Sequence, residues 1–163
     1  MAHVVRPGRE GDIPALLEIF NDAVANSTAT FDLEPQTLEQ RSAWFLSHGG
    51  AYPLVVVEAG GLLVGYATLS PFRDKPAYSK TAESSVYVHR GHRGRGAGRA
   101  AMDAVIAKAG ELGFHTVVAG IVPPNEASVR LHESLGFVHV GDFREVGFKF
   151  GRWQDVSFYQ LSF

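Results

Sequence analysis

The sequence contains no cysteine in its 163 residues, which excludes disulfide bonds, thiolate nucleophiles and cysteine-ligated metal sites. It also has no apolar run near the roughly 20 residues that a membrane-spanning helix requires. The first residues lack the basic and then apolar order of a signal peptide. We therefore expect a cytoplasmic protein with no membrane partner. We expect no metal either, because five histidines without an assigned role show no metal-ligand spacing: His3, His48, His89, His115 and His139.

A strong charge of one sign is also missing. The net charge is -2, which gives no general reason to expect nucleic acid. Positive charge gathers at one turn, in His89, Arg90, His92, Arg93, Arg95 and Arg99. An anionic ligand or a solvated basic loop would explain the cluster. A nucleic-acid binder, whose affinity should fall steeply with salt, is disfavoured because few aromatic residues interleave with these charges.

The hydrophobic content of 45% predicts one globular domain over residues 1–163 with a sizeable core. Apolar periodicity and turn residues predict strands at 3–6, 54–59, 62–71, 81–88, 116–122, 137–145 and 155–163. Helices are predicted at 12–26, 37–48, 96–112 and 125–135. This order indicates an α/β (α+β) fold with a mixed, mostly antiparallel sheet of about seven strands and helices on both faces. The helix at 96–112 makes the one clear parallel crossover.

A glycine-rich turn follows the strand at 81–88 and opens the next helix. Glycines let backbone amides approach a ligand closely, and a helix start favours a pyrophosphate. A P-loop needs Lys-Ser/Thr after its last glycine, but Arg99-Ala100 follows Gly98. Gly96-Ala-Gly98-Arg-Ala-Ala101 fits the dinucleotide fingerprint, yet the acidic residue expected about 20 positions later is missing from Thr116 to Val122.

Two motifs carry a family resemblance. Arg93-Gly-Arg-Gly96-Ala-Gly98 fits Gln/Arg-x-x-Gly-x-Gly/Ala, and Asn125-Glu-Ala-Ser128 begins a helix that Gly136-Phe137 ends. The chain therefore resembles the GCN5-related N-acetyltransferases (GNAT). Further motifs are similar to the phosphinothricin and methionine sulfone (sulfoximine) acetyltransferase branch: Phe20-Asn-Asp-Ala-Val24, Thr28-Ala-Thr-Phe31, Val86-Tyr-Val-His89, Leu131-His132-Glu133 and Lys149-Phe-Gly-Arg-Trp153.

The resemblance implies a homodimeric enzyme that uses acetyl-CoA to acetylate the α-amino group of a small amino acid or analogue. It implies that the amides of Val86, Tyr87 and Val88 bind the pantetheine and the acetyl carbonyl. The pyrophosphate would bind the amides of Arg93, Gly94, Arg95, Gly96, Ala97, Gly98 and Arg99, and the CoA groove would be lined by Asn125 and Ser128. The implied substrate residues are Phe31, Arg73, Asp74, Lys75, Tyr78, Glu83, Ser84 and Ser85.

The chemistry requires a base, because an ammonium group cannot attack a thioester. Glu83 is the candidate, commonly acting through water in the family; the alternative is an ordinary edge-strand carboxylate. The oxyanion calls for a backbone donor, for which Val88 or Tyr87 is predicted. His132 would protonate the departing thiolate, or else only pack against the groove wall.

A substrate carboxylate would match the planar fork of Arg73. Lys75 or Lys149 would assist, although each of these three cations is also interpreted as a solvated surface charge. Phe31 and Tyr78 are predicted pocket walls or core caps, and Trp153 a packing or dimer residue.

Other functions stay open at this stage. A protein N-terminus or a polyamine is an alternative acceptor, although the Phe72-Arg-Asp-Lys-Pro76 loop is basic on balance and favours an anionic substrate. A non-catalytic CoA-binding sensor is a further alternative. Without cysteine, the predicted route is direct attack in a ternary complex.

Overall fold

The part of the chain that the computed structural model describes, residues 2–163, contains seven strands in one mixed sheet. Their order across the sheet is β1-β2-β3-β4-β5-β7-β6. Only β4 and β5 pair in parallel within this described part. The strands are β1 (His3–Pro7), β2 (Leu54–Ala59), β3 (Leu62–Pro71), β4 (Thr81–Val88), β5 (Thr116–Ile121), β6 (Val138–Lys149) and β7 (Arg152–Ser162). The predicted α/β class with a mostly antiparallel sheet is confirmed.

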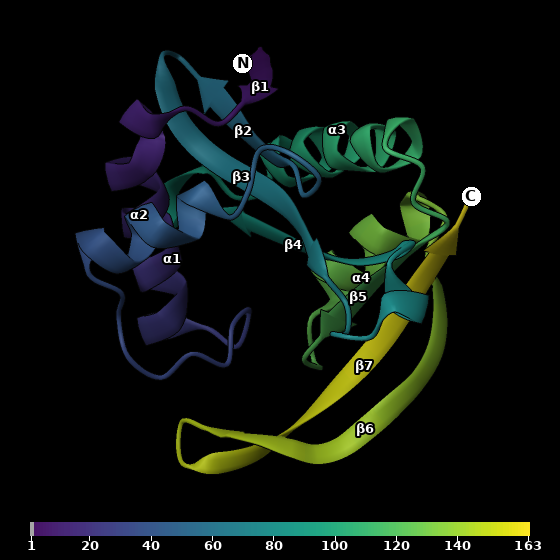
Figure 1. Cartoon of the computed structure of the whole chain (residues 1–163). Helices are drawn as coiled ribbons and strands as arrows, with labels where there is room; N and C mark the ends of the chain where they lie inside the picture. Colours follow the sequence, from purple (N-terminus) through teal and green to yellow (C-terminus); the bar gives the residue numbers. More distant parts are fainter. Residues whose placement is uncertain (1) are drawn as a thin grey trace.

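Four α-helices cover the two faces of the described sheet. α1 (Ile13–Asn26) and α2 (Leu38–Leu46) lie on one face, and α3 (Ala97–Glu111) and α4 (Glu126–Ser134) on the other (Figure 1). α2 begins with a capping box: the Thr37 hydroxyl accepts from the Gln40 amide at 3.1 Å, and the Gln40 side chain accepts from the Thr37 amide at 2.9 Å. No helix within residues 2–163 is both long and apolar enough to cross a membrane.

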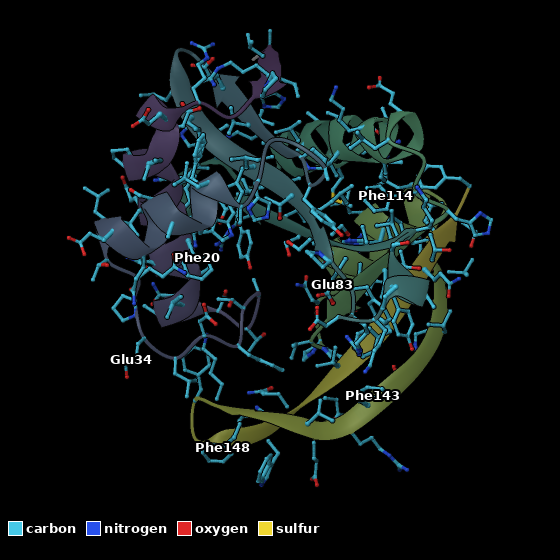
Figure 2. All side chains as sticks on the ribbon, viewed as in Figure 1. Phe20, Glu34, Glu83, Phe114, Phe143 and Phe148 are labelled. Carbon is cyan, nitrogen blue, oxygen red and sulfur yellow. The ribbon has the colours of Figure 1, made fainter. Side chains whose placement is uncertain are left out.

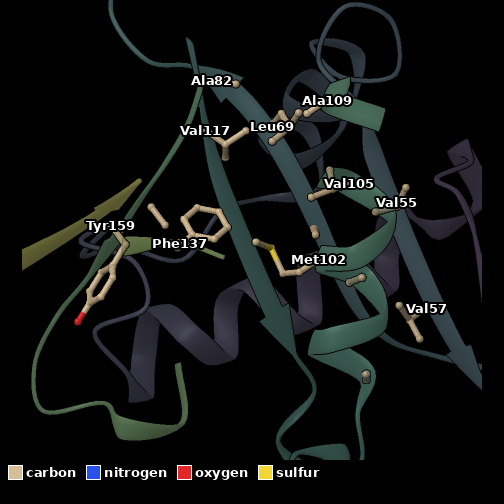
Figure 3. Packing of buried hydrophobic residues seen from close by; sticks show 14 of the residues in the cluster. Val55, Val57, Leu69, Ala82, Met102, Val105, Ala109, Val117, Phe137 and Tyr159 are labelled. Carbon is tan, nitrogen blue, oxygen red and sulfur yellow. The ribbon is translucent and has the colours of Figure 1, made fainter. Parts of the chain in front are cut away.

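Each face of the sheet has its own hydrophobic core. On the α3 face, Met102, Val105 and Ala109 recur at helical spacing and are fully buried (Figure 3). On the α1 face, Leu16 and Tyr66 are fully buried in a smaller cluster. Because β4 lies between these two cores, its alternating side chains are held from both sides.

The sheet opens between β4 and β5. Their register pairs only Thr81 with Thr116, Ala82 with Val117, and Glu83 with Val118. β4 continues to Val88 and stays paired with β3 from Ala82 to Val88. The part of β4 beyond Glu83 therefore presents backbone groups that have no β5 partner.

The closing hairpin is longer than predicted, so the expected ends at 145 and 155 are wrong. β6 runs to Lys149 and β7 starts at Arg152. The chain reverses at Phe150 and Gly151, which have φ angles of 56° and 71°, as a tight two-residue hairpin turn requires. A register irregularity between positions 143 and 147 lets β6 continue beyond Glu145. The other predicted elements agree within two residues.

Candidate active site

The opening between β4 and β5 forms a cleft of about 380 Å³. One wall is the unpaired half of β4, and the other is β5 with the start of α4. The predicted site residues that line the cleft are Ser84, Ser85, Val86, Tyr87, Val88, Arg93, Gly98, Asn125, Ser128 and His132. The structure therefore brings together residues that lie far apart in the sequence, in a space elongated along β4.

Backbone alternation decides which β4 amides face the cleft. The amide of His89 donates to the Val64 carbonyl of β3 at 2.7 Å, and the β3–β4 register is regular. Since successive residues of a strand point their amides to opposite sides, Tyr87 also donates toward β3, whereas Val86 and Val88 point toward the cleft. Of the two amides considered for the oxyanion, Val88 has the suitable direction and Tyr87 does not.

The turn at the end of the cleft is built for close approach by an anion. Gly94 and Gly96 have φ angles of 74° and 89°, which favour glycine. The Ala100 amide is the first of α3 that donates to a carbonyl of this turn, that of Gly96, at 3.0 Å. The preceding amides of the first turn have no intrahelical partner.

A Cβ on Gly98 would lie 3.5 to 3.9 Å from Val88, Leu131 and Val86, so a side chain there would fill the cleft mouth. The buried Ser84 hydroxyl also lacks a partner among the described residues. These features fit a pantetheine and pyrophosphate.

The basic residues of the turn are tied to α1 and β4. Arg90 and Arg93 both approach Asp22, at 3.2 and 3.9 Å. The Arg93 Nε also donates to the Val88 carbonyl at 3.4 Å. Because Arg93 is exposed and its contacts are long, its guanidinium can turn to an anionic ligand at little cost.

Glu83 lies on the α1–α2 face of β4 (Figure 2), the same face as Tyr87, whose ring packs in the α1 core. Its carboxyl group is half-buried, and this burial raises its pKa, while the nearby Arg73 guanidinium lowers it in part. A raised pKa makes the carboxylate a stronger base, so the environment of Glu83 suits proton removal.

His132 is buried, and the hydrogen bond of its Nδ1 determines the tautomer of its ring. Its Nδ1 lies 2.8 Å from the Ser128 carbonyl. A carbonyl only accepts, so Nδ1 carries the hydrogen and Nε2 presents a lone pair in the neutral ring. Burial also lowers the pKa of His132. The geometry therefore favours His132 as a neutral hydrogen-bond acceptor in the groove wall over an acid for the thiolate.

Asn125 has a structural task in addition to any contact with a ligand. Its side chain caps α4 by accepting from the Ser128 amide at 3.2 Å. This cap fixes the start of the helix that forms one wall of the cleft, and through Ser128 it also fixes the carbonyl that holds His132.

The remaining predicted substrate residues lie on two loops. Arg73, Asp74, Lys75 and Tyr78 are exposed on the loop after β3, where the Arg73 guanidinium stacks 4.2 Å from the Phe72 ring. Phe31 lies on the loop after α1. Its ring packs so closely on Gly147 of β6 that any Cβ at Gly147 would overlap it. Phe31 is thus held against the hairpin.

Lys149 does not behave as a solvated charge. Only 4% of it is exposed, and its ammonium donates to the Thr30 carbonyl at 2.8 Å. This bond anchors the loop that carries Phe31 to β6. Burial lowers the pKa of Lys149, and Asp32 opposes that shift.

Comparison with known proteins decides the family. The profile of the Acetyltransferase (GNAT) family matches residues 15–137, which include α1, the cleft and α4. The chain belongs to the GNAT acetyltransferase family. The splayed strand, the glycine-rich turn and the α4 wall therefore form the candidate active site of an N-acetyltransferase.

Individual relatives of this acetyltransferase cover nearly the whole chain. The phosphinothricin N-acetyltransferase of Streptomyces coelicolor is 46% identical over 160 residues, which cover 96% of this chain and 94% of that protein. The L-methionine sulfoximine/L-methionine sulfone acetyltransferase of Pseudomonas paraeruginosa is 40% identical, covering 99% and 95%. The structure of a phosphinothricin acetyltransferase from Sinorhizobium meliloti in complex with acetyl-CoA superposes with a TM-score of 0.95 at 33% identity, covering 99% and 89%.

Some cleft residues of the acetyltransferase were not predicted. The end of α1 and the following loop contribute Ile19, Ala23, Ser27, Thr28 and Ala29, and β5 contributes Ala119 to Val122. Only Thr28 and Ala29 had a signal in the sequence, as part of the Thr28–Phe31 motif. The others are small or aliphatic residues, and their position depends on how the helix and strand pack.

Proposed function

We propose that this enzyme transfers an acetyl group from acetyl-CoA to the α-amino group of a small amino acid or an analogue, such as phosphinothricin, methionine sulfone or methionine sulfoximine. The observation that carries the proposal is the position of Glu83 where β4 leaves β5. There a half-buried carboxylate of raised pKa stands beside a cleft that fits pantetheine. The relatives at 46% and 40% identity, named for these analogues, support the acceptor class.

Acetyl-CoA supplies a thioester carbonyl, and the Val86 and Val88 amides would align it along β4. Glu83, directly or through water, would take the proton from the substrate ammonium. The neutral amine then attacks the carbonyl, and the Val88 amide stabilises the oxyanion. The absence of cysteine excludes an acetyl-cysteine intermediate, so we propose direct attack in a ternary complex.

The acceptor would enter from the α1–α2 face, the face to which Glu83 belongs. Arg73 acts electrostatically on Glu83 and is free to pair with a substrate carboxylate. Across the site from Arg73, Phe31 and the loop that Lys149 holds through Thr30 would form the wall against which the substrate side chain packs. An anionic amino acid fits this surface better than a polyamine, which would call for acidic residues on the Arg73 loop.

We also propose a homodimer that uses the β6–β7 hairpin. Large apolar side chains that are more than half exposed follow this hairpin: Val138, Val140, Phe143, Val146, Phe148, Phe150 and Trp153. Figure 2 shows Phe143 and Phe148 along this hairpin. An apolar surface of this kind marks an interaction site in most monomers. Light scattering should give twice the monomer mass, and Phe148→Glu should reduce it.

Thiol release from acetyl-CoA tests the acceptor class. The panel contains L-methionine sulfone, L-methionine sulfoximine, L-phosphinothricin, ordinary L-amino acids, spermidine and an N-terminal peptide. Turnover confined to the amino acids and analogues supports the proposal. Turnover of spermidine or the peptide alone would replace it with another amine, and acetyl-CoA binding without any turnover would indicate a sensor. Because acetyl-CoA is a cytoplasmic metabolite, we place the reaction in the cytoplasm, where it would detoxify such analogues.

A further inference from the structure

Two polar side chains that have no part in the mechanism so far lie beside Glu83. Ser70 of β3 is the direct register partner of Glu83 on β4. His48, just after α2, places its Nε2 3.3 Å from the Ser70 hydroxyl oxygen. Residues directly opposite on antiparallel strands have Cβ atoms about 5 Å apart on the same face. Ser70 therefore lies beside Glu83, close enough for one water to bridge its hydroxyl group and the Glu83 carboxyl group.

The hydrogen bonds of His48 determine which group donates in the contact between Ser70 and His48. Its Nδ1 lies 2.9 Å from the Trp44 carbonyl and 3.0 Å from the Ser47 hydroxyl oxygen, which itself donates to that carbonyl at 2.6 Å. A carbonyl can only accept, so Nδ1 carries the hydrogen and Nε2 is a lone pair. The Ser70 hydroxyl then donates to His48, and its own lone pairs remain available on the Glu83 side.

The proposed reaction requires a route by which a proton leaves Glu83 in each cycle. Each turnover converts an ammonium and a thioester into an amide and a thiol, with release of one proton. A base that accepts this proton must lose it again before the next cycle. Glu83 is half-buried, so direct exchange with bulk solvent is restricted.

We propose that Ser70 and His48 are positioning residues that return Glu83 to its carboxylate form. The proton on Glu83 passes through the bridging water to the Ser70 oxygen as the Ser70 hydroxyl proton passes to the His48 Nε2. The resulting imidazolium then loses a proton to water. No oxidant or second substrate is needed, and the chain ends each cycle as it began. This inference rests on the proposed function.

The electrostatic environment brings the pKa values of Glu83 and His48 closer together. Burial lowers the pKa of His48, and Arg41 of α2 adds to that shift, whereas the Trp44 carbonyl opposes it. Burial raises the pKa of Glu83, and Arg73 opposes that shift. The proton affinities of Glu83 and His48 thus become more similar. A histidine that is neutral at neutral pH can take up a proton and release it again quickly.

The test compares Ser70→Ala, His48→Gln and His48→Ala with the wild type, using an amino acid that turns over. Each variant should lower kcat by about tenfold or more, with the KM for acetyl-CoA unchanged. Ser70→Thr retains the hydroxyl on a strand that accepts a β-branched residue, and should keep most of the activity. His115→Gln, an exposed histidine outside the site, is the matched control and should match the wild type.

Three readouts separate a relay from a structural role. Added imidazole should restore kcat several-fold in His48→Ala and leave the wild type unchanged. His48→Gln should cost no further activity in a Glu83→Gln background, because it acts through Glu83. The acid side of the kcat pH profile should shift in Ser70→Ala. The inference would be overturned if Ser70→Ala and His48→Gln both kept the wild-type kcat. It would also be overturned if His48→Gln lowered kcat by the same factor in the Glu83→Gln background as in the wild type and imidazole did not restore the kcat of His48→Ala.

The same measurements keep this inference apart from the proposed function. Failure of the wild type to acetylate any amino acid refutes the proposed function. An active wild type that loses activity in Glu83→Gln but not in the Ser70 and His48 variants refutes only the relay. Circular dichroism melting of each variant identifies loss of fold. If His48→Ala is unstable, Ser70→Ala, which removes only one hydroxyl group, still tests whether the relay contributes to kcat.

Discussion

Glu83→Gln tests the proposed base most sharply. Glutamine retains the size of the side chain but cannot take up a proton. An α-amino group with a pKa of about 8 is neutral in about a tenth of the molecules at pH 7. A substrate that arrives neutral needs no base. If Glu83 acts only by removing this proton, its loss at pH 7 cannot cost more than about tenfold for such an amine, and about tenfold more for each further unit of amine pKa.

The structure determines the form of the pH profile. Burial raises the pKa of the Glu83 carboxyl group, and Arg73 reduces that rise. The carboxylate is the active form, so wild-type kcat/KM should fall as the pH drops through this raised pKa. In Glu83→Gln that acid limb disappears. Its kcat/KM should instead rise about tenfold per pH unit until the substrate amine is neutral, where the two enzymes converge.

The assay is thiol release from acetyl-CoA over a pH series, with two substrates whose amines differ in pKa. The dissociation constant of acetyl-CoA, measured by calorimetry, should be the same in both enzymes. A deficit that is independent of pH and of the amine would refute proton removal as the role of Glu83. Wild-type activity at neutral pH would return Glu83 to the interpretation as an ordinary strand carboxylate.

Three further predictions concern the surroundings of the site. Arg73→Ala should raise the KM for the amino acid about tenfold or more while the KM for acetyl-CoA stays unchanged, because this exposed guanidinium would pair with the acceptor carboxylate and lies outside the lining of the CoA cleft. An amino-acid KM equal to that of the wild type would exclude the carboxylate clamp. Lys149→Met should free the Phe31 loop by removing the bond to Thr30 and raise the amino-acid KM more than it lowers kcat, which steady-state kinetics with both substrates will decide. Asp12→Asn should lower the unfolding free energy by about 1–3 kcal/mol at neutral pH, because Arg6 donates to both Asp12 oxygens at 2.8 Å and thereby lowers the Asp12 pKa. That contribution exists above the ordinary pKa and is lost as the pH falls through the lowered value, so urea unfolding should show a smaller difference in acid, and a difference that grows in acid would contradict it.

The sequence predicted the elements whose signals are local. The glycine-rich turn and the helix that follows it have their signals within a few neighbouring residues. The structure has Gly94 and Gly96 at positive φ in this turn, and α3 begins at Ala97, within one residue of the predicted start. The opening between β4 and β5 has no local signal, because it depends on β5 turning away to pair with β7. Residue 150 has a φ angle of 56° without being glycine, which is why the hairpin turn was not recognised.

The roles of side chains also divide into those with a local signal in the sequence and those that depend on tertiary packing. Lys149 and Thr30 are 119 positions apart in the sequence, and His48 and Ser70 are 22 apart. No spacing rule connects such pairs. Lys149, which lay between two predicted strands, was therefore interpreted as an assistant of Arg73 or a solvated charge, and His48 received no role. Only the packing of α2 over β3, and of the loop after α1 on β6, turns these residues into parts of a site.

The geometry of β4 explains why one strand can serve both the proposed donor and the proposed acceptor. Its backbone direction offers the Val86 and Val88 amides within the plane of the sheet, across the opening toward β5. Its side-chain direction places Glu83 out of that plane, toward α1 and α2. An acetyl group aligned in the plane would then meet an amine that comes from the face, which is the approach that attack on a planar carbonyl requires. A shift of the carboxylate by one residue, to position 84, would bury it on the α3 face among apolar side chains and separate the base from the acceptor. The three-residue pairing of β4 with β5, which ends at Glu83 itself, is thus what brings the two directions together at one point.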